Sequence, residues 1–242
     1  MQGSFWSIVK ANVAPEGADR EDALNEWWND HAGEYAAKDG FARAWRMRAA
    51  EADGSIGAPP HRYHAVYEID AVATFNRALE EGTDSHPGDP WGPWQSYVDR
   101  YVLDWERTYY RILHREEADP GRGRWWACVK ADLDLDEAQE PEFQEWYNGK
   151  HMPEIVAYPG VHRGWRLQVE PDDNDLAPRR QRFWGVYEID APERFAAARQ
   201  DRADRGIEPW DGIWLPHVSN FEISFYELLS EEGHEEARAA RA

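Results

Sequence analysis

The residues best suited to chemistry in this chain lie in one short stretch, Glu145–Glu154. It places Trp146, Tyr147, Asn148 and His151 within one or two turns of a predicted helix. The pKa of imidazole lies near neutrality, so a histidine that points from a helix end into an apolar pocket is suited to general acid–base catalysis. Tyr147 and Asn148 each offer a directed donor that could hold a developing oxyanion.

Each of these residues also has an ordinary structural explanation. His151 could bond to the backbone at the helix end, Tyr147 could fill the core, and Asn148 could begin a bend before Gly149. Large aromatic side chains such as Trp146 are usually buried in cores or pocket walls. We therefore predict His151, Tyr147 and Asn148 as catalytic residues and Trp146 as a wall that contacts the substrate.

Composition excludes several classes of partner. The net charge of −20 would repel the phosphates of nucleic acids and the surface of anionic membranes. No apolar run approaches the roughly 18 residues needed to span a bilayer, and the N-terminus shows no signal-peptide pattern. A single cysteine, Cys128, excludes an internal disulfide and a cysteine-based metal cluster. We expect a cytoplasmic protein that binds neither nucleic acid nor membrane.

The chain repeats itself. Val66–Asp70 recurs unchanged as Val186–Asp190, 120 positions later, and the Trp-Arg pair at Trp45 recurs at Trp165 with the same offset. The aromatic helix stretch has a counterpart that begins at Glu26, shifted by one position because the second copy has one extra residue between Asn148 and His151. A period this long repeats a whole domain rather than a solenoid unit.

Hydrophobic periodicity and turn residues give the same element order in both copies, β-α-β-β-α-β, which is the ferredoxin-like unit. An apolar sheet face must be covered, and two copies can cover each other. The predicted fold is α+β: two ferredoxin-like units packed sheet to sheet about a pseudo-twofold axis, with the helices outside. The predicted divisions are residues 1–118, 119–230 and a charged tail, 231–242.

The second copy resembles a known family. Trp146–Asn148, Lys150–Glu154 and Pro159–Val161 resemble the first-helix motif of EthD-like proteins, members of the dimeric α+β barrel superfamily. Superfamily members usually pair two identical chains, and this chain resembles a tandem fusion of two units. The resemblance implies a small-molecule pocket between the sheet and the helices of each unit. The first copy keeps Trp27, Asn29, His31 and Gly40 but lacks the matching prolines, so the second copy is the better candidate.

Further candidates come from the strands. Glu68 and Glu188 lie mid-strand and are predicted to pair with Arg46 and Arg166 on the neighbouring strands, either as structural ion pairs or as holders of a substrate carboxylate. Apart from Trp146, the predicted substrate contacts are Arg166, Tyr187 and His217 in the second copy and Trp28, His31 and Tyr67 in the first.

No sequence motif for a nucleotide, a metal or a serine nucleophile occurs, so we expect no cofactor and no metal. The resemblance covers cofactor-free monooxygenases, isomerases, cyclases, dehydratases, haem enzymes and plain ligand binders, and fold alone does not select among them. We expect a cofactor-independent lyase or isomerase that uses His151 on a small apolar or aromatic carbonyl or carboxylate compound. The alternatives are a cofactor-free monooxygenase on an aromatic substrate and a non-enzymatic binding protein. The expected oligomeric state is a monomer or a homodimer.

Overall fold

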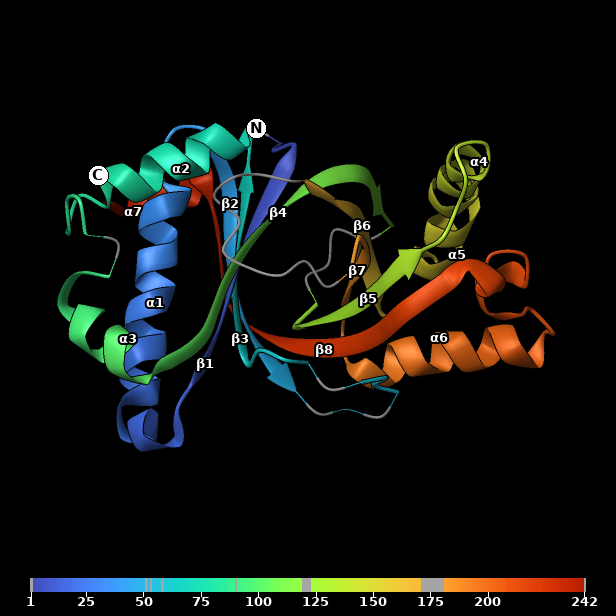
Figure 1. Cartoon of the computed structure of the whole chain (residues 1–242), viewed down its shortest axis with the longest axis horizontal. Coiled ribbons are helices and arrows are strands. Elements are labelled where there is room, and N and C mark those ends of the chain that lie inside the picture. The colour runs from blue at the N-terminus through green and yellow to red at the C-terminus, as the bar shows by residue number, and fades with distance from the viewer. Residues whose placement is uncertain are drawn as a thin grey trace.

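Eight strands form a closed antiparallel barrel in the order β1-β3-β2-β8-β5-β7-β6-β4 (Figure 1). The computed structural model describes residues 2–50, 52, 54–57, 59–89, 91–118, 123–170 and 181–241. The strands are β1 Phe5–Val13, β2 Phe41–Ala50, β3 Tyr63–Ile69, β4 Val102–Glu117, β5 Trp125–Leu133, β6 Val161–Glu170, β7 Phe183–Ile189 and β8 Val218–Gly233.

Helices cover the barrel on two opposite sides (Figure 1). One group consists of the helices of the first half together with the C-terminal helix: α1 Glu21–Ala36, α2 Val72–Glu81, α3 Gln95–Tyr101 and α7 His234–Arg241. The other group belongs to the second half: α4 Gln139–Trp146, α5 Met152–Val156 and α6 Pro192–Asp204. Short 3-10 turns occupy Pro15–Arg20, Gly92–Trp94, Pro209–Asp211 and Leu215–His217. The predicted α+β fold with two ferredoxin-like units is confirmed.

Two long strands join the halves. The first part of β4 pairs with β1 of its own half, and its second part pairs with β6 of the other half. Strand β8 does the same with β5 and β2. Since each 16-residue strand belongs to both sheets, the barrel has no free edge.

Strand alternation separates two kinds of core. In β7, Phe183, Tyr187 and Ile189 pack under the second-half helices, whereas Trp184 and Val186 point into the barrel. Inside the barrel, four tryptophans from β1, β2, β5 and β6 contact one another with ring centroids 5.2–6.0 Å apart, namely Trp6, Trp45, Trp126 and Trp165.

The same alternation shows that the predicted pairing of Glu68 and Glu188 with Arg46 and Arg166 is wrong. Glu188 points into the barrel and pairs with Arg163 at 2.6 Å, while Arg166 lies opposite Gly185 on the helix side. Glu68 likewise pairs with Arg115 at 2.9 Å. Each arginine lies on the opposite face of its sheet from the glutamate assigned to it.

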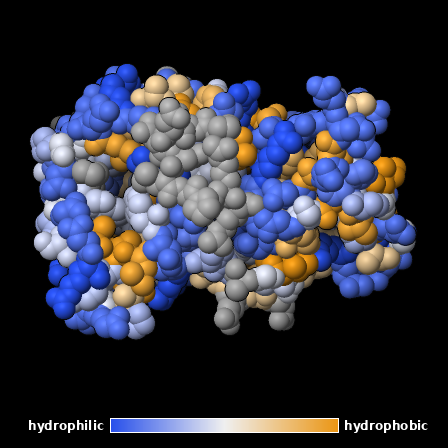
Figure 2. All heavy atoms as spheres, viewed as in Figure 1, coloured by the Kyte–Doolittle hydropathy of each residue, from blue (hydrophilic) through white to orange (hydrophobic). Residues whose placement is uncertain are grey.

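Within the predicted charged tail, 231–242, residues 231–233 complete β8 and His234–Arg241 form α7, whose Ala237 is buried against the first half. The predicted division of the chain into residues 1–118 and 119–230 stays a prediction. The sequence also predicts polar, proline-rich hairpin loops at residues 50–61 and 170–180, and the second of these falls almost entirely outside the described residues. None of the described helices is long and apolar enough to cross a membrane. On the face shown in Figure 2, hydrophilic residues predominate on both lobes, and hydrophobic patches interrupt them on each lobe.

Candidate functional site

The helix that carries the aromatic stretch is interrupted by a wider turn. Tyr147–His151 form a single π-helical turn between α4 and α5, whereas α1 is a regular α-helix over the corresponding residues. The extra residue of the second copy is therefore absorbed within the helix. A π turn of this kind often marks a functional position because it displaces side chains from the regular helical register.

His151 lies in an aromatic cage. Its ring stacks on Trp146 with centroids 4.8 Å apart, meets Tyr147 edge-on at 4.8 Å and lies parallel to Trp210 at 6.3 Å. Burial, together with the nearby charge of Arg202, lowers the pKa of His151 to about 3. The buried Nδ1 has no hydrogen-bond partner among the described residues. The imidazole is therefore neutral at pH 7, and its Nδ1 is not used by any described hydrogen bond.

A buried guanidinium lies under the same tyrosine. Arg166 is 1% exposed, and its guanidinium carbon lies 3.9 Å from the ring centroid of Tyr147. Its Nη2 donates to Gln144 at 3.4 Å, and no described carboxylate pairs with it. Burial lowers the pKa of Arg166 to about 10, so the group remains a cation at neutral pH. A buried cation without a counter-ion is costly, and an anionic ligand would compensate it.

Two tyrosine hydroxyls meet beside this cation. The Tyr147 and Tyr187 hydroxyls are 3.0 Å apart. A side chain at Gly185 would collide with the Tyr147 hydroxyl, so the glycine makes room for this contact. Burial raises the pKa of both phenols, which therefore remain protonated donors.

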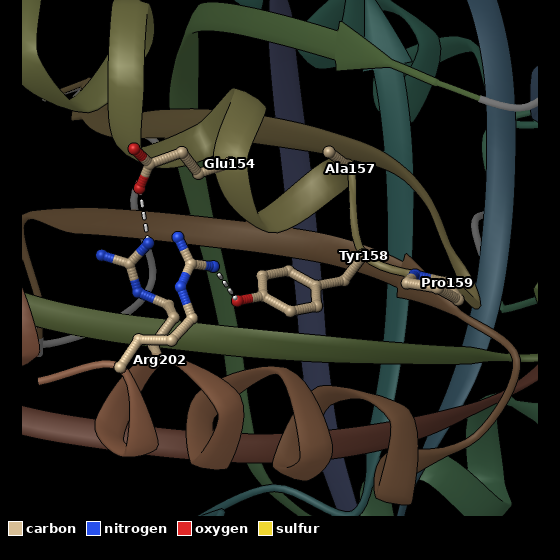
Figure 3. Close-up of a pocket in the computed structure, with 6 residues that line it drawn as sticks. Glu154, Ala157, Tyr158, Pro159 and Arg202 are labelled. Atoms are coloured by element: carbon tan, nitrogen blue, oxygen red, sulfur yellow. Dashed lines mark hydrogen bonds and ion pairs between the residues drawn. The ribbon is translucent and has the colours of Figure 1, made fainter. Parts of the chain in front are cut away.

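A charged network connects the cage to a cavity of about 390 Å³ between α5 and α6 (Figure 3). Asp211 accepts from Trp146 Nε1 at 3.0 Å and from Arg202 at 3.2 Å. Arg202 also contacts Glu154, and Arg205 reaches the Tyr158 hydroxyl at 3.4 Å (Figure 3). The cavity is thus lined by two arginines, and one of them is bonded to the carboxylate that holds Trp146.

Backbone strain accompanies this network. Trp210 and Asp211 both adopt positive φ, 55° and 50°. Non-glycine residues, and bulky ones above all, rarely take this conformation, and such strain concentrates at binding and catalytic sites. The strained pair places the Trp210 ring beside His151 and the Asp211 carboxylate beside Trp146.

The first half holds a matching arrangement. Trp27 stacks on His31 at 4.5 Å, as Trp146 stacks on His151. Arg46 is fully buried, with its guanidinium carbon 3.6 Å from the ring centroid of Trp28. It donates to Asn25 at 2.8 Å, as Arg166 does to Gln144, and burial lowers its pKa to about 9. Trp28 takes the place of Tyr147.

The predicted site residues therefore form two groups. Trp146, Tyr147, His151, Arg166 and Tyr187 lie together in the second half, and Trp28 and His31 share the first-half helix with Tyr67 packed in the same core.

Two predicted residues, Asn148 and His217, are described separately from these groups. Asn148 lies on the π turn, and its buried Oδ1 has no partner among the described residues. His217 ends the turn that precedes β8, and its Nδ1 instead bonds to the backbone oxygen of Asp134 at 2.8 Å.

Sequence reasoning missed Trp210, Asp211, Arg202 and Gln144. The repeat of the Pro-Trp pair at positions 90–91 and 209–210 was the one signal for Trp210. No signal existed for the charged residues, because their approach depends on the packing of α6 and the Pro209–Asp211 turn against the π turn. Within the described residues, no group of three or more His, Cys, Asp or Glu side chains is placed to hold a metal ion.

Solved structures with this architecture are numerous. No protein-family model matches the chain, and no curated protein sequence is similar to it. An anthrone oxidase-like protein superposes with a TM-score of 0.66 at 10% identity, covering 98% of this chain and 95% of its own. A monooxygenase candidate from Lactobacillus acidophilus NCFM gives 0.59 at 8% identity, covering 96% and 97%. A chlorite dismutase candidate gives 0.54 at 12% identity, covering 98% of both chains.

The chain has the dimeric α+β barrel fold. At these identities the likeness establishes the fold alone, and the size of the chain agrees with a fusion of two units.

Proposed function

We propose that the chain is a cofactor-free enzyme that oxidises a small aromatic substrate with molecular oxygen, using the cage around His151. The observation that carries this proposal is the buried Arg166 cation, which has no described carboxylate partner and packs on the ring of Tyr147, the tyrosine that also contacts His151. A neutral base and a cation with no counter-ion among the described residues, both on one aromatic ring, suit a reaction that generates a substrate anion.

The chemistry needs only an activated C–H group and oxygen. His151 takes a proton from the substrate, and Arg166 with the Tyr147 hydroxyl holds the resulting enolate or phenolate. The imidazolium and the anion attract each other, which raises the pKa of the imidazole while the substrate is bound. The anion passes one electron to oxygen, and the two radicals combine to a peroxide. The peroxide takes the proton from His151 and loses water, which converts a CH₂ group into a carbonyl.

Two further observations support this proposal. The walls are tryptophan, tyrosine and phenylalanine, which favour a flat aromatic substrate. Arg202 and Arg205 line the neighbouring cavity together with Glu154, so its charged lining is net positive and a substrate with an acidic group is favoured there. We propose that this cavity is the entrance to the site.

The names of the structural neighbours favour oxidation over the lyase or isomerase expected first. The three neighbours are called an anthrone oxidase-like protein, a monooxygenase candidate and a chlorite dismutase candidate. Proton transfer by His151 is common to both reaction types, so the same residues serve either. We also propose the finer assignment to the EthD-like group, a cytoplasmic location and a monomer or homodimer.

Oxygen consumption with anthrone-2-carboxylate as probe tests the proposal. We expect turnover above the enzyme-free rate, with the anthraquinone as product. His151→Gln should lower kcat/KM by about 10²-fold or more, the usual contribution of a general base. Arg166→Gln should lower kcat more than it raises KM, because the charge is needed most when the anion forms.

The matched control is His114→Gln. His114 contacts Glu116 at 3.1 Å and lies on β4, away from the cage. Its substitution should leave turnover unchanged. Wild-type turnover in His151→Gln would refute the assigned role of His151, and no turnover in the wild type would refute the oxidase proposal.

A further inference from the structure

His31 has a partner that His151 lacks. Its Nδ1 lies 3.2 Å from Glu34 Oε2, and the ring is 4% exposed. Its Nε2 makes no hydrogen bond to the described part of the chain. A carboxylate on one nitrogen fixes the tautomer and orientation of the ring and leaves the other nitrogen as a base.

Glu34 is itself held in place as an anion. Burial alone would raise its pKa, but hydrogen bonds from His31 and Ser85 outweigh this effect and hold the pKa at about 2. In the second half the corresponding glutamate, Glu154, contacts Arg202 instead, so His151 has no carboxylate on Nδ1. The duplicated helix has thus kept the histidine in both copies and the His–Glu pair in the first alone.

The surroundings of His31 contain the other parts of a site. Trp27 stacks on one side of the ring, and Tyr35 meets it edge-on at 5.0 Å. The Tyr35 side chain is 2% exposed, and its hydroxyl has no hydrogen-bond partner among the described residues. An unpartnered buried hydroxyl is costly, and a substrate oxygen would satisfy it. Arg46 supplies the buried cation, as Arg166 does in the second half.

The cavity beside this site, which forms its rim, has a lining of opposite net charge to the cavity beside the second-half site. A cavity of about 530 Å³ borders Glu34, where α7 and the end of β8 lie against α1. Its charged lining consists of one arginine and four carboxylates, namely Arg241, Asp30, Glu34, Glu232 and Glu236. This rim disfavours an acidic substrate, whereas the arginines of the second-half cavity favour one.

We propose that the first half is a second catalytic site, in which Glu34 positions His31 as the general base for aromatic substrates that are neutral or carry an amine. This inference rests on the proposed function and uses the same steps. His31 Nε2 takes the substrate proton, oxygen accepts the electrons, and the peroxide regains the proton and loses water.

Two probes separate the halves: unsubstituted anthrone, which is neutral, and anthrone-2-carboxylate. We expect His31→Gln to lower kcat/KM for anthrone by about 10²-fold while turnover of the carboxylate is kept, and His151→Gln to do the reverse. Glu34→Gln tests positioning. The amide still accepts the Nδ1 proton but carries no charge, so kcat for anthrone should fall with little change in KM.

Folding is checked separately, because Glu34 is part of the packed helix. Thermal unfolding of Glu34→Gln and His31→Gln should be followed beside the kinetics, and the kept carboxylate turnover shows that the barrel is intact. If His31→Gln and Glu34→Gln oxidise both probes like the wild type while His151→Gln abolishes both, the first-half site is refuted and the proposed function stands. If the wild type oxidises neither probe, the proposed function fails and this inference falls with it.

Discussion

His151 and His31 occupy the same place in two copies of one helix, yet their electrostatic surroundings differ. Both rings stack on a tryptophan. His31 has a carboxylate at 3.2 Å, whereas His151 faces the charge of Arg202 and has no described partner on Nδ1. Because the protein around His151 stabilises only the neutral ring, this residue contributes to the pH dependence of folding.

The stability of the protein should fall below neutral pH, in part because of His151. Its pKa is lowered from 6.5 to about 3, so between these values the unfolded chain binds a proton that the folded chain does not. The free energy of unfolding therefore decreases as the pH falls through 6.5. Between pH 7 and pH 5 the His151 contribution to this loss should be about 2 kcal/mol.

Urea unfolding at the two pH values measures this loss in the wild type and in His151→Gln. The substitution should reduce the loss by the His151 contribution and leave that of other groups, such as His64, which is 2% exposed and whose pKa is also lowered by burial. An equal loss in both proteins would show that His151 is accessible to protons in the folded state.

At the scale of elements, the helix of the second half combines a π turn with a glycine, and a second glycine faces it from β7. Gly149 lies in the π turn, where an added Cβ would meet nothing within 4 Å. Gly185 lies in β7, where an added Cβ would collide with the Tyr147 hydroxyl. Gly149 therefore affects stability through backbone entropy alone, whereas Gly185 makes room for the aromatic cage.

The two glycines should respond oppositely to alanine. Gly149→Ala should stabilise the protein by about 0.5–1 kcal/mol, because alanine is the better helix former and meets no obstacle. Gly185→Ala should destabilise it by about 1–3 kcal/mol, since it forces the Tyr147 ring out of place. Denaturant unfolding measures both. A stabilising Gly185→Ala would mean that the tyrosine moves away without cost.

Much of the element order could be read from the sequence, because periodicity and turn residues are local. The β-α-β-β-α-β order follows from such signals, and the repeat predicts the pseudo-twofold axis. The partners of Glu68 and Glu188 were predicted wrongly, because the face of a residue on a neighbouring strand depends on register. Both copies shift register near the start of the second strand, between Phe41 and Arg43 and between Val161 and Arg163. As a result Arg43 lies opposite Glu68, and Arg163 lies opposite Glu188.

The site was predictable only in part, for the same reason. Trp146, Tyr147 and His151 are close in sequence, and one helix brings them together. Asp211 lies 65 residues after Trp146, and Arg202 lies 48 residues after Glu154, so only the folded chain shows that these pairs meet.

At the scale of the whole molecule, the barrel interior carries charge as well as tryptophan. Lys130 on β5 is 3% exposed and bonds to Glu222 at 2.6 Å, Tyr226 at 3.2 Å and Ser224 at 3.3 Å. Burial would raise the pKa of Glu222, but Lys130 outweighs that effect and lowers it. The pair joins two adjacent strands inside the closed barrel, where neither charge has ready access to water.

Removing the cation alone should be costly. Lys130→Met leaves Glu222 buried without its partner, and breaking a buried pair in this way typically costs about 3–5 kcal/mol. The double variant Lys130→Met with Glu222→Gln should recover much of this loss, because it removes the stranded charge as well. Arg111→Met is the matched control, since Arg111 pairs with Glu170 between β4 and β6 with its side chain 55% exposed. Its loss should cost less than about 1 kcal/mol. Urea unfolding of the three variants decides the matter: equal costs for Lys130→Met and Arg111→Met would show that water reaches the barrel interior and that the buried pair does not hold the two strands together.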